Sequence, residues 1–290
     1  MRFTTALMAS LMLAAPALAD DVSYEVSGEA FTGYVAEAQD PKGLVLIVHD
    51  WDGMTDYERK RADMLAEMGY NAFALDMFGN DTPTETVDHR KAATGALYKD
   101  RERMRALIQA GIDQARQRDG DGEMVVMGYC FGGVVSLEMA RSDMSEMAKG
   151  YASFHGGLST PEGQSWTGDE PPVLVLHGGA DTSITLDDVA TLAKELEGSG
   201  TTYSIKVYSG APHAFTVFGS NRYRHGELEG VFGFPDRTAL ISRVREGARH
   251  IAPRALHLTR LALAGAPLEA VPCAAGSGGC KHRLGPGLVS

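Results

Sequence analysis

Apolar residues occur along the chain in two patterns, which predict alternating strands and helices. Short, continuous apolar runs suit strands that are buried on both faces of a parallel sheet. Such runs occupy the segments 43–50, 70–76, 123–128, 150–157, 171–179 and 202–210. Before them, the stretches "VSYEV" and "AFTGYVAEA" alternate weakly between apolar and polar residues, which predicts an antiparallel hairpin.

Segments with apolar residues at helical spacing lie between these runs. Thr55–Glu58 has the sequence of a capping box, and the helix that it opens is expected to end at Gly69. Further helices are predicted over 84–118, 132–140 and about 185–197. Because strand and helix alternate in this way, we expect an α/β fold with one doubly wound, mostly parallel sheet and helices on both faces.

Residues 1–19 have the features of a secretory signal peptide, namely Arg2, an apolar stretch and the small-residue ending Ala17-Leu18-Ala19. A buried N-terminal helix is the alternative interpretation. We expect the mature chain to begin near Asp20 and to be secreted, most simply into a bacterial periplasm. No cysteine stands directly after the cleavage site and no later segment is apolar for long enough to cross a bilayer, so we expect no membrane anchor.

The C-terminal segment differs in composition from the rest of the chain. From Ile241 onward basic residues outnumber acidic ones, aromatic residues are absent, and the end is rich in glycine. We predict a single α/β domain over 20–240 and an atypical, poorly ordered tail over 241–290. Our hypothesis is that this tail is foreign to the fold, through translation in an altered reading frame. Its Cys273 and Cys280 either pair after export or stay unpaired.

The overall charge and the cysteine content exclude two classes of protein. The chain has 27 Lys+Arg against 38 Asp+Glu, so it lacks the basic surface of a nucleic-acid-binding protein. Three cysteines in 290 residues are too few for a disulfide scaffold. We expect a monomer that acts on a small molecule and has no nucleic-acid partner.

The stretch "MGYCFGG" is the first motif that carries chemistry. It places Cys130 between Gly128 and Gly132, where a predicted strand passes into a predicted helix. This is the setting of a nucleophile elbow, because glycines permit the sharp turn and the close approach of the backbone. The helix N-terminus favours a thiolate, and the Phe131 N–H would stabilise an oxyanion. A buried structural cysteine is the alternative.

Two later residues could serve as the base and its orienting acid. Asp181 follows the run "VLVLHGG", and His213 follows "SIKVYSGAP". Both lie at the carboxyl ends of predicted strands, which is the edge where parallel sheets hold their sites. Nucleophile, acid and histidine also follow one another in the order that hydrolases of this architecture use.

The segments "HDWDGM", "GYCFGG", "HGGAD" and "PHAF", in this order, resemble the dienelactone hydrolase family. The resemblance extends over about 31–222, which is most of the mature chain. It implies an α/β-hydrolase fold with a Cys130–His213–Asp181 triad that acts without a metal or an organic cofactor.

The same resemblance implies roles for two residues after the first long strand. Asp50 stands where the family has a glutamate that contacts the resting thiol, and its side chain is one methylene shorter. The N–H of the next residue, Trp51, would be the second oxyanion donor beside that of Phe131.

Substrate selection is less clearly encoded. Dienelactone enzymes bind a substrate carboxylate with arginines, one of them shortly after the catalytic histidine, and "AFTVFG" here contains none. Arg90 is a candidate replacement, with a helix-surface charge as the alternative. Since a thiolate is a better leaving group than a simple alkoxide, a cysteine enzyme favours activated esters, lactones or thioesters.

We therefore expect an exported hydrolase of activated esters or lactones that works through an acyl-enzyme. The alternatives are a thioesterase or carboxylesterase, or a non-catalytic exported binding protein, including an enzyme inactivated by its tail. His49, His155 and His177 all end predicted strands. They lack the carboxylate–histidine spacing of metalloenzymes, so no metal site is expected.

Overall fold

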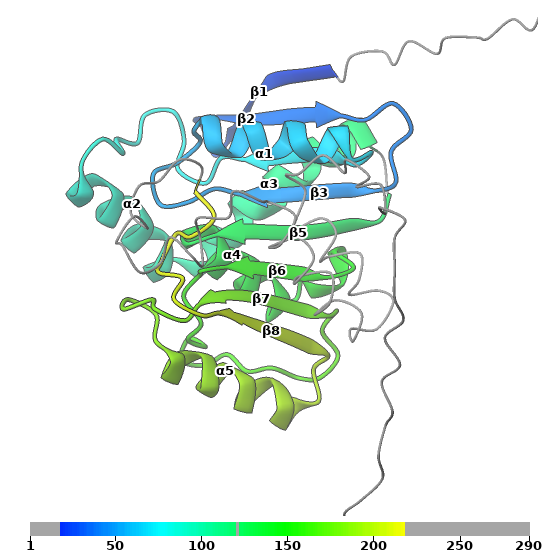
Figure 1. Cartoon of the computed structure of the whole chain (residues 1–290). Coiled ribbons are helices and arrows are strands. Elements are labelled where there is room, and N and C mark those ends of the chain that lie inside the picture. Colours follow the sequence, from blue (N-terminus) through cyan, green and yellow to red (C-terminus); the bar gives the residue numbers. More distant parts are fainter. Residues whose placement is uncertain (1–17, 120–121, 218–290) are drawn as a thin grey trace, which may run out of the picture.

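The computed structural model describes residues 18–119 and 122–217, and these form one eight-stranded sheet (Figure 1). The strand order is β1-β2-β4-β3-β5-β6-β7-β8. β2 is antiparallel to both β1 and β4, and every other neighbouring pair is parallel. The strands are β1 (Leu18–Val26), β2 (Glu29–Glu37), β3 (Leu44–Val48), β4 (Asn71–Leu75), β5 (Met124–Tyr129), β6 (Tyr151–Phe154), β7 (Val173–Gly178) and β8 (Tyr203–Tyr208).

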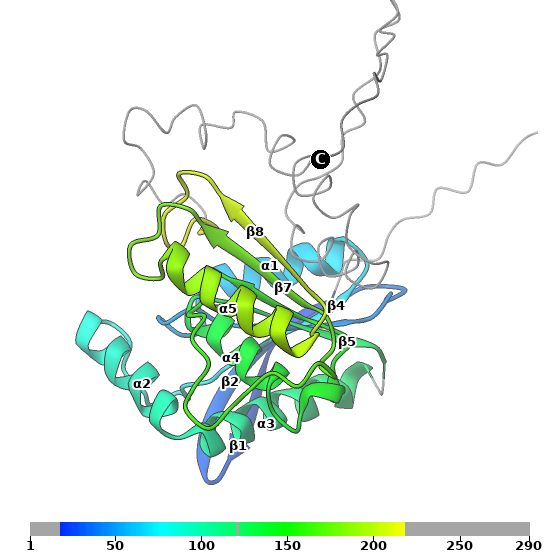
Figure 2. The ribbon, with the colours of Figure 1, turned by 90° about the horizontal axis from the view of Figure 1, so that it is seen from below.

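Helices cover both faces of the sheet (Figure 2). On one face, Leu65 of α1 packs in a core cluster with Ile47 of β3. On the other face, Leu107 of α3 and Leu192 of α5 pack in a cluster that contains Leu46. This arrangement confirms the predicted fold class. The helices are α1 (Asp56–Glu67), α2 (Val87–Lys99), α3 (Arg101–Asp119), α4 (Phe131–Ala140), α5 (Leu186–Ser199) and the 3₁₀ turn η1 (Ser145–Met147).

The two-sided cover explains why the central strands read as continuous apolar runs. All residues of β3 are buried. Leu44, Leu46 and Val48 belong to the core cluster beneath α3 and α4, whereas Val45 and Ile47 belong to the cluster beneath α1. Because successive side chains of a strand point to opposite faces, both faces require apolar residues.

The predicted helix starts are confirmed where a threonine caps the helix. Thr55 and Thr185 each form a capping box with the acidic residue three positions later. α1 ends one residue before Met68, and Gly69 then takes a φ of +86°. A glycine adopts that left-handed conformation without the steric cost that a side chain would add.

The predicted helix over 84–118 is wrong in one respect, because it is two helices. α2 and α3 meet at Asp100, whose backbone leaves the helical conformation (φ −119°, ψ 83°). The Asp100 Oδ1 accepts a hydrogen bond from the Arg103 N–H at 2.9 Å. Aspartate competes for backbone N–H groups in this way at helix N-termini, and here the competition starts a new helix.

Two predictions concern the chain ends. The predicted signal peptide up to residue 17 and the atypical tail over 241–290, with its two cysteines, lie outside the described residues. Leu18 and Ala19, at the predicted cleavage site, are the first residues of β1 and stand opposite Glu37 and Ala36 of β2. Over 18–119 and 122–217, no helix is long and apolar enough to span a bilayer.

Candidate active site

Cys130 lies at a sharp turn between β5 and α4, with a positive φ of 49° and a ψ of −106°. Two glycines make this turn possible. A Cβ on Gly128 would lie 1.9 Å from the Gly132 carbonyl oxygen, and one on Gly132 would lie 2.2 Å from that of Val48. The backbone at the turn therefore tolerates no side chain at either position. This geometry is that of a nucleophile elbow.

The structure brings Cys130 together with the two other predicted triad residues. The Cys130 Sγ lies 3.1 Å from the His213 Nε2, and the His213 Nδ1 lies 2.8 Å from the Asp181 Oδ2. The other carboxylate oxygen of Asp181 accepts the N–H groups of Ser183 at 2.8 Å and of Ile184 at 3.0 Å. The aspartate is thus held by the loop after β7 and directs one oxygen at the imidazole.

The three side chains differ in burial. Asp181 is buried, whereas His213 and Cys130 are partly exposed. Because a carboxylate accepts hydrogen bonds and cannot donate them, the His213 Nδ1 carries the proton toward Asp181. The Nε2 that faces the sulfur is then the nitrogen that can accept the thiol proton, which is the arrangement that a general base requires.

Asp50 also lies beside the thiol. Its carboxylate makes a hydrogen bond with Cys130, and its Oδ1 accepts the Trp51 N–H at 2.5 Å. Burial raises the pKa of Asp50 to about 6, and the Trp51 N–H opposes this shift. The aspartate side chain is therefore long enough to reach the thiol, and it occupies the N–H that was predicted to be the second oxyanion donor.

The surroundings of Cys130 favour the neutral thiol. Burial and the nearby Asp50 carboxylate raise the pKa of Cys130, whereas the N–H of Phe131 lowers it. The Phe131 N–H at the helix N-terminus thus favours a thiolate as expected, but the pKa of the thiol is raised overall. Desolvation and a like charge outweigh the backbone N–H at this position. The Phe131 N–H therefore lies close enough to the sulfur to affect its pKa.

Two buried side chains that the sequence interpretation did not assign to the site hold the loop after β3. Glu58 accepts the N–H groups of Asp50 at 3.3 Å and of Thr55 at 3.0 Å, so it fastens both ends of the loop. His49 contacts the Asp50 carbonyl oxygen at 2.6 Å and accepts the Met77 N–H at 3.0 Å. The capping-box pattern was the only sequence signal for Glu58, and His49 had none beyond its place at a strand end.

Tyr98 of α2 stands at the exposed side of the site. Its ring lies 5.7 Å from that of Phe131, and the Arg101 guanidinium lies 5.4 Å from the Tyr98 ring centre. Burial raises the pKa of Tyr98, and the nearby Cys130 and Asp50 raise it further. No sequence pattern indicated that Tyr98 belongs to the site.

Arg90, the candidate substrate clamp, lies beside the loop after β3. Its Nε donates to the Thr84 carbonyl oxygen at 2.6 Å, and its guanidinium lies 5.6 Å from the centre of the Trp51 ring. It is therefore close to the predicted oxyanion donor and is held there by α2 and the segment before it.

The three strand-end histidines, His49, His155 and His177, each contact a different partner. His155 contacts the Thr216 hydroxyl at 2.8 Å, and His177 contacts the Ile184 carbonyl oxygen at 3.0 Å. Burial lowers the pKa of His155, and the nearby His213 lowers it further. Among the described residues, no three His, Cys, Asp or Glu side chains are grouped as metal ligands would be.

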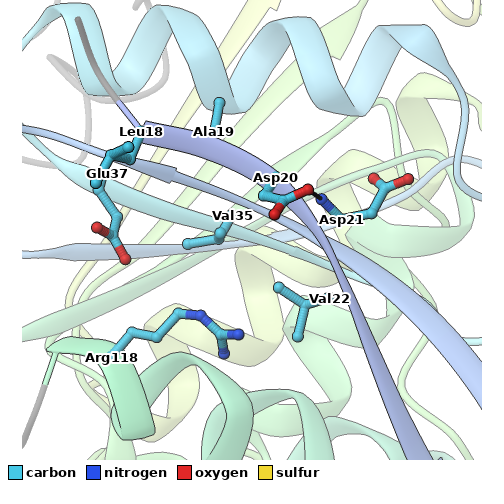
Figure 3. A pocket seen from close by; sticks show the side chains of 8 residues that line it. All are labelled: Leu18, Ala19, Asp20, Asp21, Val22, Val35, Glu37 and Arg118. Atoms are coloured by element: carbon cyan, nitrogen blue, oxygen red, sulfur yellow. Dashed lines mark hydrogen bonds between the residues drawn. The ribbon is translucent and has the colours of Figure 1, made fainter.

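Two cavities lie outside the triad. One, of about 280 Å³, lies where β1 and β2 face the end of α3, and Figure 3 shows Arg118 and Glu37 extending into it. The other, of about 210 Å³, adjoins the loop after β3 and is lined by residues that include Asp52, Met54 and Phe78. Neither contains a triad residue.

We expect Asp50→Asn to make Cys130 more reactive. The substitution keeps the shape of the side chain but removes the negative charge that raises the pKa of the thiol, so more thiolate forms at a given pH. Alkylation of Cys130 by iodoacetamide at pH 8, followed by mass spectrometry of its peptide, should be faster than in the wild type. Below about pH 6 the difference should shrink, since Asp50 is then protonated.

Asp52→Asn is the matched control for this measurement. Asp52 also raises the pKa of Cys130, but by less than Asp50 does, so its removal should accelerate alkylation less than that of Asp50. An Asp50→Asn variant that reacts no faster than the wild type at pH 8 would contradict the assignment.

Comparison with solved structures identifies the class of fold to which this sheet and its helices belong. The chain superimposes with a TM-score of 0.64 on a dienelactone hydrolase-like promiscuous phosphotriesterase from metagenomic libraries, at 24% identity, over 86% of this chain and 97% of that one. The sheet, its strand order and the elbow after β5 thus define an α/β-hydrolase fold.

Sequence comparison identifies the family. The profile of the Dienelactone hydrolase family matches residues 31–229. A protein of Aquifex aeolicus strain VF5 named "Putative carboxymethylenebutenolidase" is 25% identical over 67% of this chain and 85% of its own length. A protein of the same name from Salmonella typhimurium is 28% identical over 66% of this chain and 75% of its own length. The chain therefore belongs to the dienelactone hydrolase family and is a hydrolase of the carboxylic ester and lactone class.

Proposed function

We propose that the protein hydrolyses activated carboxylic esters or lactones through an acyl-enzyme on Cys130. The line of contacts from the Cys130 Sγ through His213 to the Asp181 carboxylate supports this most strongly. These contacts join three loops at the carboxyl ends of β5, β8 and β7, where sheets of this kind hold their sites. The strained turn at the nucleophile is the second support.

Acylation begins when the Cys130 sulfur attacks the substrate carbonyl carbon. The thiol proton passes to the His213 Nε2, and Asp181 stabilises the resulting imidazolium through Nδ1. The carbonyl oxygen becomes an oxyanion, which the Phe131 and Trp51 N–H groups bind. When the tetrahedral intermediate collapses, the carbon–oxygen bond to the leaving group breaks and the imidazolium protonates the departing oxygen. A thioester on Cys130 remains.

Deacylation uses the same groups in the reverse order. A water molecule gives a proton to the His213 Nε2 while its oxygen attacks the thioester carbon. The carbon–sulfur bond then breaks, the imidazolium returns its proton to the sulfur, and the carboxylic acid leaves. No external oxidant or cofactor enters the balance.

The hydrogen bond from the Trp51 N–H to the Asp50 carboxylate has to break when substrate binds. In the resting state this carboxylate accepts that N–H and also contacts the thiol. A substrate carbonyl oxygen placed between the Phe131 and Trp51 N–H groups takes the position of this carboxylate oxygen. Displacement of Asp50 also removes the charge that disfavours a thiolate, so binding and activation of the thiol are coupled.

The leaving group defines the substrate class. A thiolate, with an ordinary pKa of about 8.5, leaves the tetrahedral intermediate more readily than a simple alkoxide does. Enolates and phenolates compete well with it, so the proposal favours enol lactones and aryl esters. The relatives named as carboxymethylenebutenolidases are consistent with a lactone substrate.

Trapping the acyl-enzyme tests this function. The protein is mixed with p-nitrophenyl acetate, quenched with acid within the first turnover, digested and examined by mass spectrometry. We expect an acetyl group on the Cys130 peptide and none there in Cys130→Ala. Peptide mapping is needed because Cys273 and Cys280 also carry sulfur. Turnover without acetylation of Cys130 would contradict the proposed mechanism.

The proposal places the reaction outside the cytoplasm. Residues 1–19 have the composition of a cleaved signal, and removal after Ala19 would leave Asp20 to Val26 paired with β2. N-terminal sequencing of the protein from the periplasm of a bacterial host checks this. An N-terminus at Asp20 is expected, and an intact Met1 would count against export.

A further inference from the structure

The peptide unit between Asp50 and Trp51 is held at both ends. Its carbonyl oxygen, on Asp50, contacts the His49 Nδ1 at 2.6 Å and accepts the Gly53 N–H at 3.3 Å. Its N–H, on Trp51, donates to the Asp50 Oδ1 at 2.5 Å. That carboxylate also makes a hydrogen bond with Cys130, so the Trp51 N–H and the thiol share one acceptor group.

The partners of His49 fix its tautomer. A carbonyl oxygen can only accept a hydrogen bond, so the Nδ1 beside Asp50 carries the proton. The Met77 N–H can only donate, so the Nε2 that it meets at 3.0 Å is bare. The ring is fully buried, and its centre lies 4.6 Å from that of the Phe78 ring and 5.8 Å from that of the Phe131 ring, so it is packed between two aromatic side chains.

The C=O and N–H bonds of a trans peptide point in opposite directions, and the described chain has no cis peptide. The ring that holds the Asp50 oxygen therefore also sets the direction of the Trp51 N–H. We propose that His49 is a positioning residue for the oxyanion hole: its Nδ1–H holds the Asp50 carbonyl so that the Trp51 N–H is directed at the reacting carbonyl oxygen. This inference rests on the proposed function, because it assigns a role to His49 in the same acyl transfer.

The other two buried strand-end histidines also contact the loops that carry triad residues. His155 follows β6 and contacts Thr216 on the loop that carries His213. His177 ends β7 and contacts Ile184, whose own N–H binds Asp181. Within the described residues, the Nδ1 of each has no hydrogen-bond partner, whereas His49 uses both nitrogens. His49 thus has the more strictly defined orientation, as a residue that orients a single peptide unit requires.

Two substitutions separate the two bonds of His49. An asparagine side chain places its amide nitrogen near the position of Nδ1, so His49→Asn retains the donor to the Asp50 oxygen and loses the acceptor for Met77. A glutamine places its amide near Nε2, so His49→Gln retains an acceptor for Met77 and loses the donor. Both variants replace the imidazole ring and so lose its packing against the Phe78 and Phe131 rings. Each therefore serves as the packing control for the other.

For p-nitrophenyl acetate hydrolysis, we expect His49→Gln to lower kcat about a hundredfold, as loss of one oxyanion donor does. KM should change little, because the contact strengthens in the transition state. His49→Asn should lower kcat less than tenfold. Alkylation of Cys130 by iodoacetamide is the companion reaction, since it needs the thiol but forms no oxyanion. Its rate should be nearly unchanged in both variants.

The outcomes distinguish the inference from the proposed function. If Cys130→Ala hydrolyses the ester as fast as the wild type, the proposed function fails. If Cys130→Ala is inactive but His49→Asn and His49→Gln lose hydrolysis equally, or lose alkylation in step with hydrolysis, the role of His49 is structural and the inference alone is overturned.

A measurement on the unaltered protein covers the case in which a variant does not fold. In the ¹⁵N spectrum of the wild type, His49 should show a protonated Nδ1 and a bare Nε2. The opposite tautomer would place an acceptor against the Asp50 oxygen and would overturn the inference without any substitution.

Discussion

Cys130→Ala is expected to lower kcat/KM for p-nitrophenyl acetate at least about a thousandfold while the protein stays folded. The alanine removes the atom that attacks the substrate, and no other thiol of the described chain is present to replace it. The His213–Asp181 pair at 2.8 Å remains. It can only activate water directly, which leaves a small residual rate.

Cys130→Ser is the matched variant for this result. The serine retains a nucleophile next to the His213 Nε2, but its hydroxyl gives up a proton less readily than a thiol does, so activity should lie between that of the wild type and that of the alanine variant. Thermal unfolding should show similar stability for all three proteins. Equal hydrolysis by the wild type and the folded alanine variant would mean that the fold carries no cysteine chemistry, and the non-catalytic alternative would then apply.

Gly132→Ala is expected to destabilise the fold by more than about 3 kcal/mol. The new Cβ would lie 2.2 Å from the Val48 carbonyl oxygen and 2.7 Å from that of His49, and both atoms belong to the backbone at the end of β3. Neither can turn aside as a side chain does. α4 would have to move away from the central sheet, and the Cys130 turn would move with it. Urea unfolding measures this loss.

Gly95→Ala is the control for the glycine effect. Gly95 lies within α2, and its added Cβ would meet nothing within 4 Å. Because alanine has the higher helix propensity, this variant should be more stable by up to about 1 kcal/mol. If both variants unfold at the same urea concentration, the close approach at Gly132 is not the constraint inferred from the structure.

The strands of the sheet were predictable because each one is encoded locally. Each buried strand contributes alternate residues to two cores, so β3 and β7 stand out as apolar runs without any knowledge of the tertiary structure. The break at Asp100 was not predictable in the same way, because the residues on both sides have a helical pattern. The decision between a continuous helix and a new N-cap depends on one side-chain hydrogen bond.

The site was predictable where residue type and turn geometry define it together. Cys130 between two glycines, and Asp181 and His213 at strand ends, lie in hydrogen-bonding contact as expected. The balance of charge around the thiol was not predictable. It depends on which way the Asp50 carboxylate turns and on how much water reaches Cys130, and both are set by residues distant in the chain. The orientation of the Asp50–Trp51 peptide likewise has no sequence signature.

The strand order also has a consequence for folding. The triad contact between Cys130 and His213 joins residues 83 positions apart, and the bond from Tyr57 of α1 to Thr216 joins residues 159 positions apart. Such contacts cannot form before the parallel strands between them have paired, and pairing of this kind is slow because long loops must close first. We therefore expect hydrolytic activity to return late in refolding, after these strands have paired. A chain still being synthesised stays inactive until β8 has joined the sheet.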